Sequence, residues 1–245
     1  MHELHWLNPD DYNFPEPEDA LSVPNGLLAL GGDLKPERLL AAYRHGIFPW
    51  YEADQPILWW SPNPRMVLYP HEFHIARSLQ KVIKRQHFTV TLDMNFRAVI
   101  QSCAGKNIQN RDGTWITDDM QNAYIELHEN GWAHSLEVWQ AEKLVGGLYG
   151  IAMGTVFFGE SMFSTLSNAS KVGFVHLVSI LKERGFSLID CQIASKHLAG
   201  FGAREISRAD FIRHLQKAIP ADHSPAVSWR GGIDNTNNPE SQGKH

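Results

Sequence analysis

Three segments between residues 144 and 192 decide the fold that the sequence predicts. They read Leu144-Val145-Gly146-Gly147-Leu148-Tyr149-Gly150, Phe157-Phe158-Gly159-Glu160-Ser161-Met162-Phe163-Ser164 and Leu188-Ile189-Asp190-Cys191-Gln192. No Asp, Glu, Lys or Arg lies between Lys143 and Glu160, and five glycines interrupt this apolar run. Glycines this frequent suit strands that a second backbone or a ligand approaches closely. An acid beside so much apolar surface, such as Glu160, is either paired structurally or placed to meet a cationic ligand.

The surrounding residues predict several strands and one helix. Strands are predicted at 135–139, 144–151, 155–158 and 187–192. The first of them alternates polar and apolar residues, as a half-buried strand does. Asn168 is a suitable N-cap for a helix that runs to Arg184 and ends at Gly185. The order strand, strand, strand, helix, strand is typical of an α+β fold.

Other helices are predicted by their ends. One begins at Pro36 and closes before Gly46. Three more have expected N-caps at Asp93, Thr117 and Ser207.

Residues 74–85 predict a helix with one apolar face and one basic face. The apolar positions are Ile75, Leu79 and Val82, and the basic ones on the opposite face are Arg77, Lys81 and Lys84, with Arg85 nearby. No acid lies between Glu72 and Asp93 to neutralise them. One interpretation is an ordinary solvated helix face. In a chain that is acidic overall, a contact with nucleic-acid phosphates gains weight.

Composition sets limits on the class of protein. The 245 residues are 43% hydrophobic and 20% charged, as in soluble globular proteins. Their net charge of −5 gives no sign of a nucleic-acid partner, but a local basic patch is enough to bind one. Cys103 and Cys191 allow one disulfide at most, which fits a reducing compartment. No signal peptide is apparent, and the uncharged run is shorter than the roughly 20 residues of a membrane span. We expect a soluble, cytoplasmic protein without a membrane partner.

Several further segments resemble sequence blocks of the leucyl/phenylalanyl-tRNA–protein transferase family, in the family's order. They are residues 25–34, Gly46-Ile47-Phe48-Pro49-Trp50, Trp59-Trp60-Ser61-Pro62 and Gly113-Thr114-Trp115-Ile116. The resemblance extends over residues 25–215. Several long motifs in order are far more specific than a single glycine pattern.

The resemblance implies both a fold and a reaction. The expected α+β chain has an N-terminal α+β domain at 1–95, an N-acyltransferase-like catalytic domain at 96–220, and a polar, disordered tail at 221–245. The implied reaction moves Leu or Phe, and also Met, from aminoacyl-tRNA to proteins that begin with Arg or Lys, which creates an N-terminal degradation signal. We expect a monomer with no metal and no organic cofactor.

Asp190 and Gln192 are the first candidates for catalysis. They stand two apart on a predicted strand, so both side chains project from one face, where a carboxylate and an amide can orient an amine. The alternative is a core ion pair for Asp190 and a backbone bond for Gln192. In the family, the matching residues line the reaction centre. The resemblance therefore implies that Gln192 aligns the attacking amine while Asp190 orients Gln192 or helps to accept the proton, with a hydroxyl of the terminal adenosine as another route.

Glu160 is the candidate for recognition of the acceptor. Its carboxylate would favour the cation that an N-terminal Arg or Lys brings. Alternatively, it pairs with an internal Arg or with backbone groups.

Apolar and aromatic candidates would hold the donor. Positions that in the family surround the Leu or Phe side chain are matched by Leu148, Phe157, Phe174, Leu177 and Ile189. Trp50 and Trp115 resemble tryptophans that hold the terminal adenosine, because an aromatic face can stack on any base. Every one of these residues has the alternative of being plain core.

Other chemistries find less support. The sequence has no His-Glu-x-x-His and no cysteine-paired zinc spacing. An acyl-CoA-dependent N-acetyltransferase would carry a glycine-containing pyrophosphate loop before the central helix, where this chain reads Ser164-Thr165-Leu166-Ser167-Asn168. A non-catalytic module that binds tRNA or degradation signals would not require Asp190 and Gln192.

Overall fold

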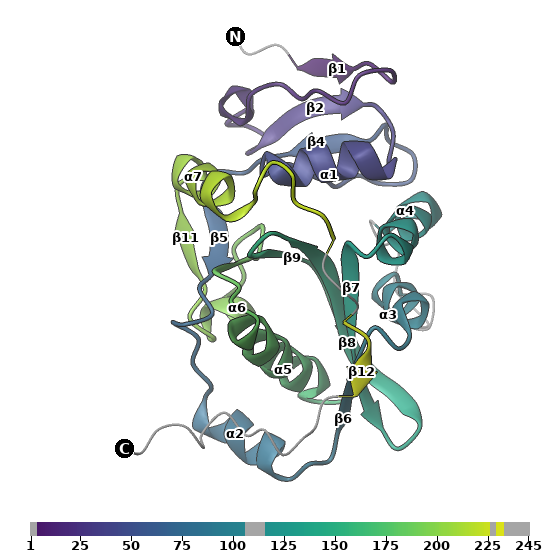
Figure 1. Ribbon diagram of the computed structural model, residues 1–245, viewed down its shortest axis with the longest axis vertical. Coiled ribbons are helices and arrows are strands. Elements are labelled where there is room, and N and C mark those ends of the chain that lie inside the picture. Colours follow the sequence, from purple (N-terminus) through teal and green to yellow (C-terminus); the bar gives the residue numbers. More distant parts are fainter. Residues whose placement is uncertain (1–3, 106–115, 226–228, 233–245) are drawn as a thin grey trace.

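The chain forms two β-sheets with helices packed around them (Figure 1). The computed structural model describes residues 4–105, 116–225 and 229–232. The smaller sheet has the strand order β1-β2-β4-β3 and the larger one β11-β5-β10-β9-β8-β7-β6-β12. The α+β class that the sequence predicts is confirmed. No helix in the described ranges is long and apolar enough to cross a membrane.

The element bounds are as follows. The smaller sheet holds β1 (His5–Leu7), β2 (Leu27–Gly31), β3 (Phe48–Pro49) and β4 (Leu58–Trp60). The larger holds β5 (Arg65–Leu68), β6 (Thr89–Leu92), β7 (Ala133–Gln140), β8 (Lys143–Met153), β9 (Val156–Ser164), β10 (Leu188–Asp190), β11 (Arg204–Ile206) and β12 (Gly231–Gly232). The helices are α1 (Pro36–Arg44), α2 (Arg77–Lys84), α3 (Phe96–Cys103), α4 (Asp118–Glu129), α5 (Ala169–Glu183), α6 (Lys196–Ala199) and α7 (Arg208–Ala218), with a 3-10 turn at Pro17–Asp19.

The larger sheet separates two hydrophobic clusters. Helix α5 packs on one face of β7, β8 and β9, and α3 packs on the other, with α4 beside it (Figure 1). Helix α1, from the N-terminal part, contacts α4. The strand–strand–strand–helix–strand order predicted for the second half is observed as β7, β8, β9, α5 and β10, with β9 and β10 parallel.

The four predicted N-caps can be compared with the hydrogen bonds that the structure shows. Thr117 and Ser207 cap α4 and α7, each through its side-chain oxygen. The prediction that Asp93 caps α3 is wrong, because Asn95 accepts the bond from the Ala98 amide instead. The Asp93 carboxylate is already used by β7, where it accepts from the Ser135 amide at 2.7 Å. Asn168 precedes α5 with a φ of 68° and makes no side-chain capping bond.

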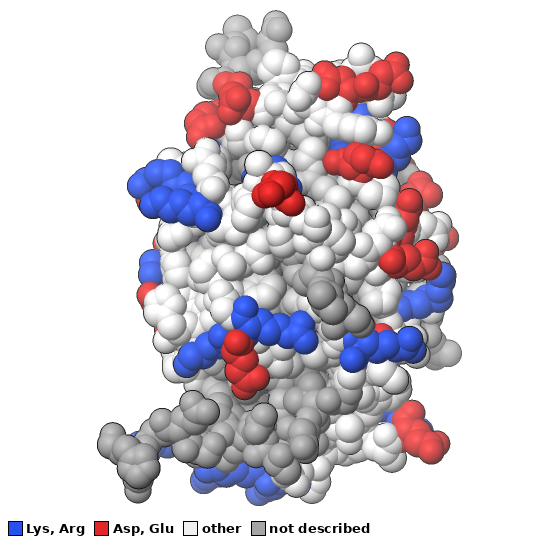
Figure 2. Space-filling model, in the orientation of Figure 1, with Lys and Arg blue, Asp and Glu red and all other residues white. Residues whose placement is uncertain are grey.

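Helix α2 is shorter than the predicted helix at 74–85, because Ile75 precedes it and Arg85 follows it, but its apolar and basic faces are as predicted. Leu79 is buried, and α2 packs against α5. Its basic residues are exposed: Arg77, Lys81, Lys84 and Arg85. Figure 2 shows Lys and Arg side chains along the lower edge of the molecule, where Figure 1 places α2.

Strand pairing crosses the predicted domain boundary at residues 95 and 96. β5 and β6 precede this boundary, yet they pair with β10 and β7 in the larger sheet. The division into domains itself stays a prediction. The disorder expected for 221–245 does not hold for residues 229–232: Trp229 is buried and stacks on His134, and β12 pairs with β6.

Gly154 closes the hairpin between β8 and β9 against the end of α7. Its φ is +59°, and a Cβ there would lie 2.1 Å from the Ala218 carbonyl oxygen. We predict that Gly154→Ala lowers the free energy of unfolding by about 2–4 kcal/mol, from backbone strain plus this clash. Gly185→Ala is the matched control, because Gly185 also has a positive φ but no atom near its missing Cβ. We expect about 1 kcal/mol there. Equal losses in urea denaturation would contradict the packing of α7 on this hairpin.

Candidate functional site

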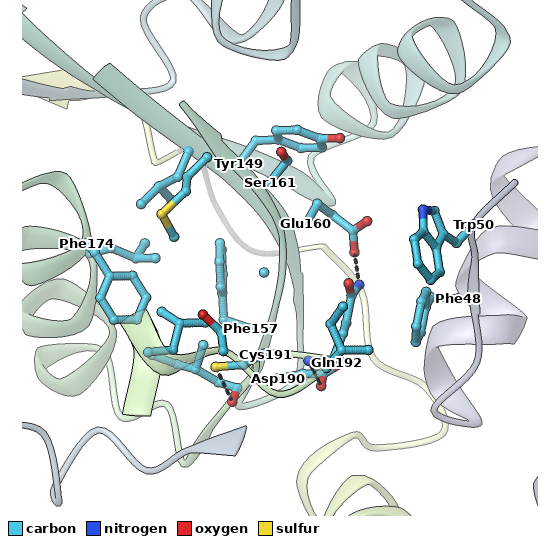
Figure 3. A pocket seen from close by; sticks show the side chains of 18 of the residues that line it. Phe48, Trp50, Tyr149, Phe157, Glu160, Ser161, Phe174, Asp190, Cys191 and Gln192 are labelled. Atoms are coloured by element: carbon cyan, nitrogen blue, oxygen red, sulfur yellow. Dashed lines mark hydrogen bonds between the residues drawn. The ribbon is translucent and has the colours of Figure 1, made fainter. Parts of the chain in front are cut away.

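The candidate site is a pocket that opens where two parallel strands separate. β9 and β10 pair up to Phe158 and Asp190; β10 then ends, whereas β9 continues to Ser164. The cavity between them measures about 350 Å³. Its other walls come from α5, from α6 and from the segment around β3. Figure 3 shows Phe174 at one end, Trp50 at the other, and Glu160 and Gln192 between them.

A β-bulge places Glu160 in this wall. Gly159 pairs with Gly150 and Ser161 with Tyr149, so Glu160 has no partner on β8. The bulge also changes which face the following side chains take. Phe158 and Phe163 are five residues apart, yet both pack into the cluster on the α3 face. A regular strand would place them on opposite faces.

The Glu160 carboxylate is held by three neutral donors. The Tyr43 hydroxyl donates to Oε1 at 2.7 Å, the Tyr124 hydroxyl to Oε2 at 3.0 Å, and the Gln192 amide to Oε1 at 3.0 Å. No Lys or Arg in the described part of the chain forms a salt bridge with it. Burial of the carboxyl group raises the pKa of Glu160 to about 7, although the tyrosine hydrogen bonds act in the opposite direction. The site therefore contains an acid that titrates near neutral pH.

Asp190 is neutralised, unlike Glu160. Arg65 donates to both of its oxygens, through Nε at 2.8 Å and Nη2 at 2.6 Å, and both side chains are buried. The same guanidinium donates to the Gly46 carbonyl and lies between the rings of Phe48 and Phe211. The core ion pair that the sequence left as an alternative for Asp190 is thus the observed arrangement.

Gln192 does not continue the strand, so the prediction of a shared strand face with Asp190 is wrong. β10 ends at Asp190, and Gln192 has a φ of 61°, rare for a residue with a side chain. The Asp190 carboxylate holds this turn by accepting a hydrogen bond from the backbone N–H of Gln192 at 2.9 Å. The turn directs the Gln192 side chain to Glu160. Within the described residues, the side-chain amide oxygen of Gln192 has no hydrogen-bond partner.

The predicted donor residues gather at the apolar end of the pocket. Its lining includes Leu148, Phe157, Phe174, Leu177 and Ile189, all of them buried. Trp50 lines the opposite end and is 41% exposed, so its ring is accessible at the rim. Trp115 lies outside the described residues. The basic residues of α2 do not line the pocket.

Three residues that build the site are not among those predicted from the sequence: Arg65, Tyr43 and Tyr124. A signal existed for Arg65, which heads the apolar run Met66-Val67-Leu68, because an arginine that is buried with such a strand needs a partner. No spacing in the sequence links Tyr43 to Tyr124, which lies 81 residues away.

Two other chemistries find no support in this geometry. Burial raises the pKa of the Cys191 thiol well above its ordinary value, which opposes formation of a nucleophilic thiolate. In the described part of the chain, no group of three or more His, Cys, Asp or Glu residues is arranged to hold a metal ion.

Comparisons with known proteins give one consistent result. The family described as leucyl/phenylalanyl-tRNA protein transferase matches residues 67–216, and the family of its N-terminal domain matches residues 32–63. The leucyl/phenylalanyl-tRNA–protein transferase of Stutzerimonas stutzeri is 60% identical over 227 residues, which cover 93% of this chain and 99% of that protein. The one from Pseudomonas aeruginosa is 61% identical and covers 87% of this chain and 94% of that protein.

More distant matches are found among solved structures. The C-terminal domain of a putative lysylphosphatidylglycerol synthetase from Agrobacterium fabrum is 8% identical, with a TM-score of 0.41, over 77% of this chain and 58% of that one.

The Arg65–Asp190 pair leads to a stability prediction. Arg65→Met would leave the Asp190 carboxylate buried without a cation, so we predict a loss of about 3–5 kcal/mol in the free energy of unfolding. Arg204→Met is the control, because Arg204 also binds both oxygens of an acid, Glu72, but at the surface. Its loss should be much smaller. Similar losses for the two variants in urea denaturation would show that burial of the pair is unimportant.

Proposed function

The chain belongs to the leucyl/phenylalanyl-tRNA–protein transferase family, and we propose that its pocket joins Leu or Phe, and also Met, from aminoacyl-tRNA to proteins that begin with Arg or Lys. One observation carries this proposal. The same pocket contains a buried apolar end, for a donor side chain, and a carboxylate without a cation, for a basic acceptor. The product begins with Leu, Phe or Met and would act as a degradation signal.

The donor would enter with its side chain at the apolar end. Phe174 and Leu177 come from α5, Phe157 from β9 and Ile189 from β10, so rigid elements shape this end. Such a pocket distinguishes Leu, Phe and Met weakly, because one methylene is worth about 1–3 kcal/mol. Trp50, accessible at the rim, would stack on the terminal adenosine.

The acceptor would approach the polar wall. Glu160 offers negative charge to its N-terminal Arg or Lys. Gln192 offers an amide oxygen that has no partner among the described residues, and this oxygen would accept a hydrogen bond from the α-amine. Asp190, occupied by Arg65, would act indirectly, by holding the turn that presents Gln192.

The main task of the protein in this reaction is to position the two substrates. The amine nitrogen attacks the ester carbonyl carbon, a C–N bond forms, and the bond to the ribose oxygen breaks. Because an ester is already an activated acyl donor, juxtaposition of the two substrates would supply much of the rate. We also propose that the protein is a cytoplasmic monomer.

Acceptor recognition gives a direct test. With Leu-tRNA and no CoA, we predict transfer to a peptide that begins with Arg and little to one that begins with Ala. Glu160→Gln should reduce use of the Arg peptide about 10–100-fold, because a hydrogen bond to a charged group is lost. Initial rates with radiolabelled Leu measure both effects. No transfer to either peptide, with acetyl transfer from acetyl-CoA instead, would overturn the proposed donor.

The basic face of α2 would contact the tRNA backbone. We predict that Lys81→Ala weakens binding of all tRNA sequences alike and reduces the slope of log affinity against log salt by about one. Lys217→Ala is the control, since Lys217 is equally exposed on α7. Filter binding at several salt concentrations measures both. An unchanged slope for Lys81→Ala would exclude a phosphate contact there.

A further inference from the structure

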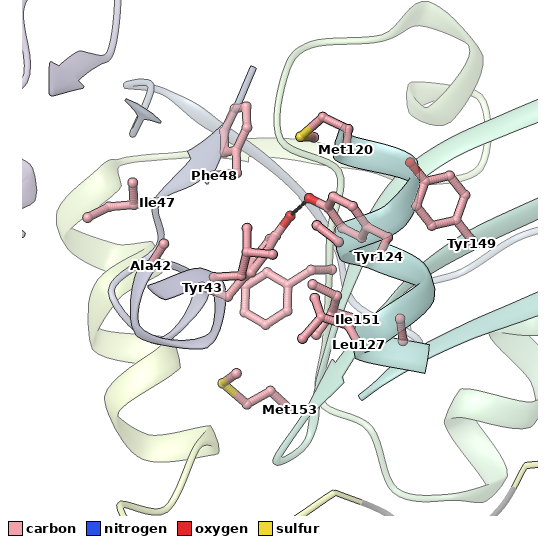
Figure 4. Packing of buried hydrophobic residues seen from close by; sticks show 14 of the residues in the cluster. Ala42, Tyr43, Ile47, Phe48, Met120, Tyr124, Leu127, Tyr149, Ile151 and Met153 are labelled. Carbon is pink, nitrogen blue, oxygen red and sulfur yellow. Dashed lines mark hydrogen bonds between the residues drawn. The ribbon is translucent and has the colours of Figure 1, made fainter. Parts of the chain in front are cut away.

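Glu160, Tyr43 and Tyr124 form a closed ring of oxygen atoms. Each tyrosine hydroxyl contacts one oxygen of the carboxylate, and the two hydroxyls also contact each other. The tyrosines come from α1 and α4, and Figure 4 shows their hydroxyl groups meeting between these helices. The ring therefore has three oxygen–oxygen contacts, each of which needs one hydrogen.

The number of hydrogens depends on Glu160. When the carboxylate is ionised, only the two tyrosine hydrogens are available for the three contacts. When Glu160 is protonated, its hydroxyl can donate to Tyr124, Tyr124 to Tyr43, and Tyr43 to the other carboxyl oxygen. Protonation thus completes the ring, while Gln192 still donates to Oε1. The two hydroxyls therefore donate to the carboxylate while it is ionised, and the ring still accommodates the proton once Glu160 takes it up.

We propose that Glu160 is the group that receives the proton released by the acceptor's α-ammonium before attack, with Tyr43 and Tyr124 as its positioning residues. This role rests on the proposed function. An ammonium nitrogen has no lone pair, so it must become an amine before it can attack. The first proton moves to the Glu160 carboxylate and then to solvent. After the C–N bond forms, the second proton leaves the nitrogen for the departing ribose oxygen, so the product is an amide and a free tRNA hydroxyl.

The other groups of the pocket are less suited to this role. Both Asp190 oxygens are bound by Arg65, and a proton there would break a buried ion pair. The Gln192 amide is not basic at neutral pH. Of the charged groups near Glu160, Asp190 on β10 raises its pKa and Arg65 on β5 lowers it. The tyrosines that face it are Tyr43, Tyr124 and Tyr149 on β8, and the pKa of each is raised, so they stay neutral.

The pKa of Glu160 is close to that of the α-amino group that it would deprotonate. The pKa of Glu160 is about 7, and an ordinary α-amino group has a pKa of about 7.7–8.0. A base whose pKa lies close to that of the acid it deprotonates, and close to working pH, is the effective choice. An ordinary carboxylate would be a much weaker base for this step.

Single-turnover rates from pH 6.5 to 9 with an Arg peptide test the proposal. We expect the wild-type rate of transfer to rise with a midpoint near 7. In Glu160→Gln, the rate should follow ionisation of the free amine, with a midpoint about one pH unit higher. The ratio of wild-type to variant rates should then fall about fivefold or more towards pH 9. The guanidinium of the peptide stays charged throughout, whereas Glu160 ionises within this range, so a pure charge-recognition role predicts a ratio that rises with pH. A ratio that rises or stays constant would overturn the proton role while leaving the transfer reaction intact.

Tyr43→Phe and Tyr124→Phe give an independent test, because each removes one hydroxyl group and keeps the aromatic side chain. Both hydroxyls lower the pKa of Glu160, so their loss raises it, and the midpoint of the rate should move up by about one pH unit. Tyr51→Phe is the matched control: Tyr51 is buried, and its hydroxyl faces Thr117 rather than Glu160. Its midpoint should not move. Thermal unfolding of each variant shows that it is folded, and unchanged midpoints in the two folded variants would contradict the ring.

Discussion

The buried ion pair between Arg65 and Asp190 is the interaction on which the site depends. It links β5 to β10, and through the Gly46 carbonyl and the Phe48 ring it also attaches the segment that carries Trp50. Burial makes such a pair costly to break, since either partner alone would be an uncompensated charge. The pair therefore fixes where β10 ends relative to the rim of the pocket. The turn at Gln192 follows from it, because the same carboxylate accepts a hydrogen bond from the backbone N–H of Gln192.

The pair also separates the roles of two neighbouring acids. Asp190 has a cation and Glu160 has neutral donors only, although both line one pocket. Two carboxyl groups with distinct environments can serve distinct purposes. Asp190 serves the architecture of the turn. Glu160 remains available to an incoming cation, and the bulge in β9 places it in the pocket wall.

The sequence predicted those parts of the structure that depend on local patterns. Alternation, apolar spacing and short-range hydrogen bonds encode the strands predicted at 135–139, 144–151 and 155–158, the helix that follows, and the caps at Thr117 and Ser207. The third strand, β9, continues past its predicted end to Ser164. The predicted cap at Asp93 failed because β7, some 40 residues later, competes for that carboxylate. The strand predicted to reach Gln192 ends early for a similar reason, since a distant Arg65 sets the position of Asp190. Long-range contacts also explain why Tyr43 and Tyr124 were missed, whereas the apolar lining of the pocket was predicted through the family resemblance.

The protonation of Glu160 tests this account most directly. Carbon-13 NMR of the glutamate carboxyl carbons, with Glu160 assigned by its absence from Glu160→Gln, would follow its titration in the free protein. The account predicts a midpoint of about 7, because the carboxyl group is buried without a cation. A midpoint near 4.5, the ordinary value, would mean that water or a cation reaches Glu160. In that case neither its role as proton acceptor nor the closed ring with the tyrosines could stand.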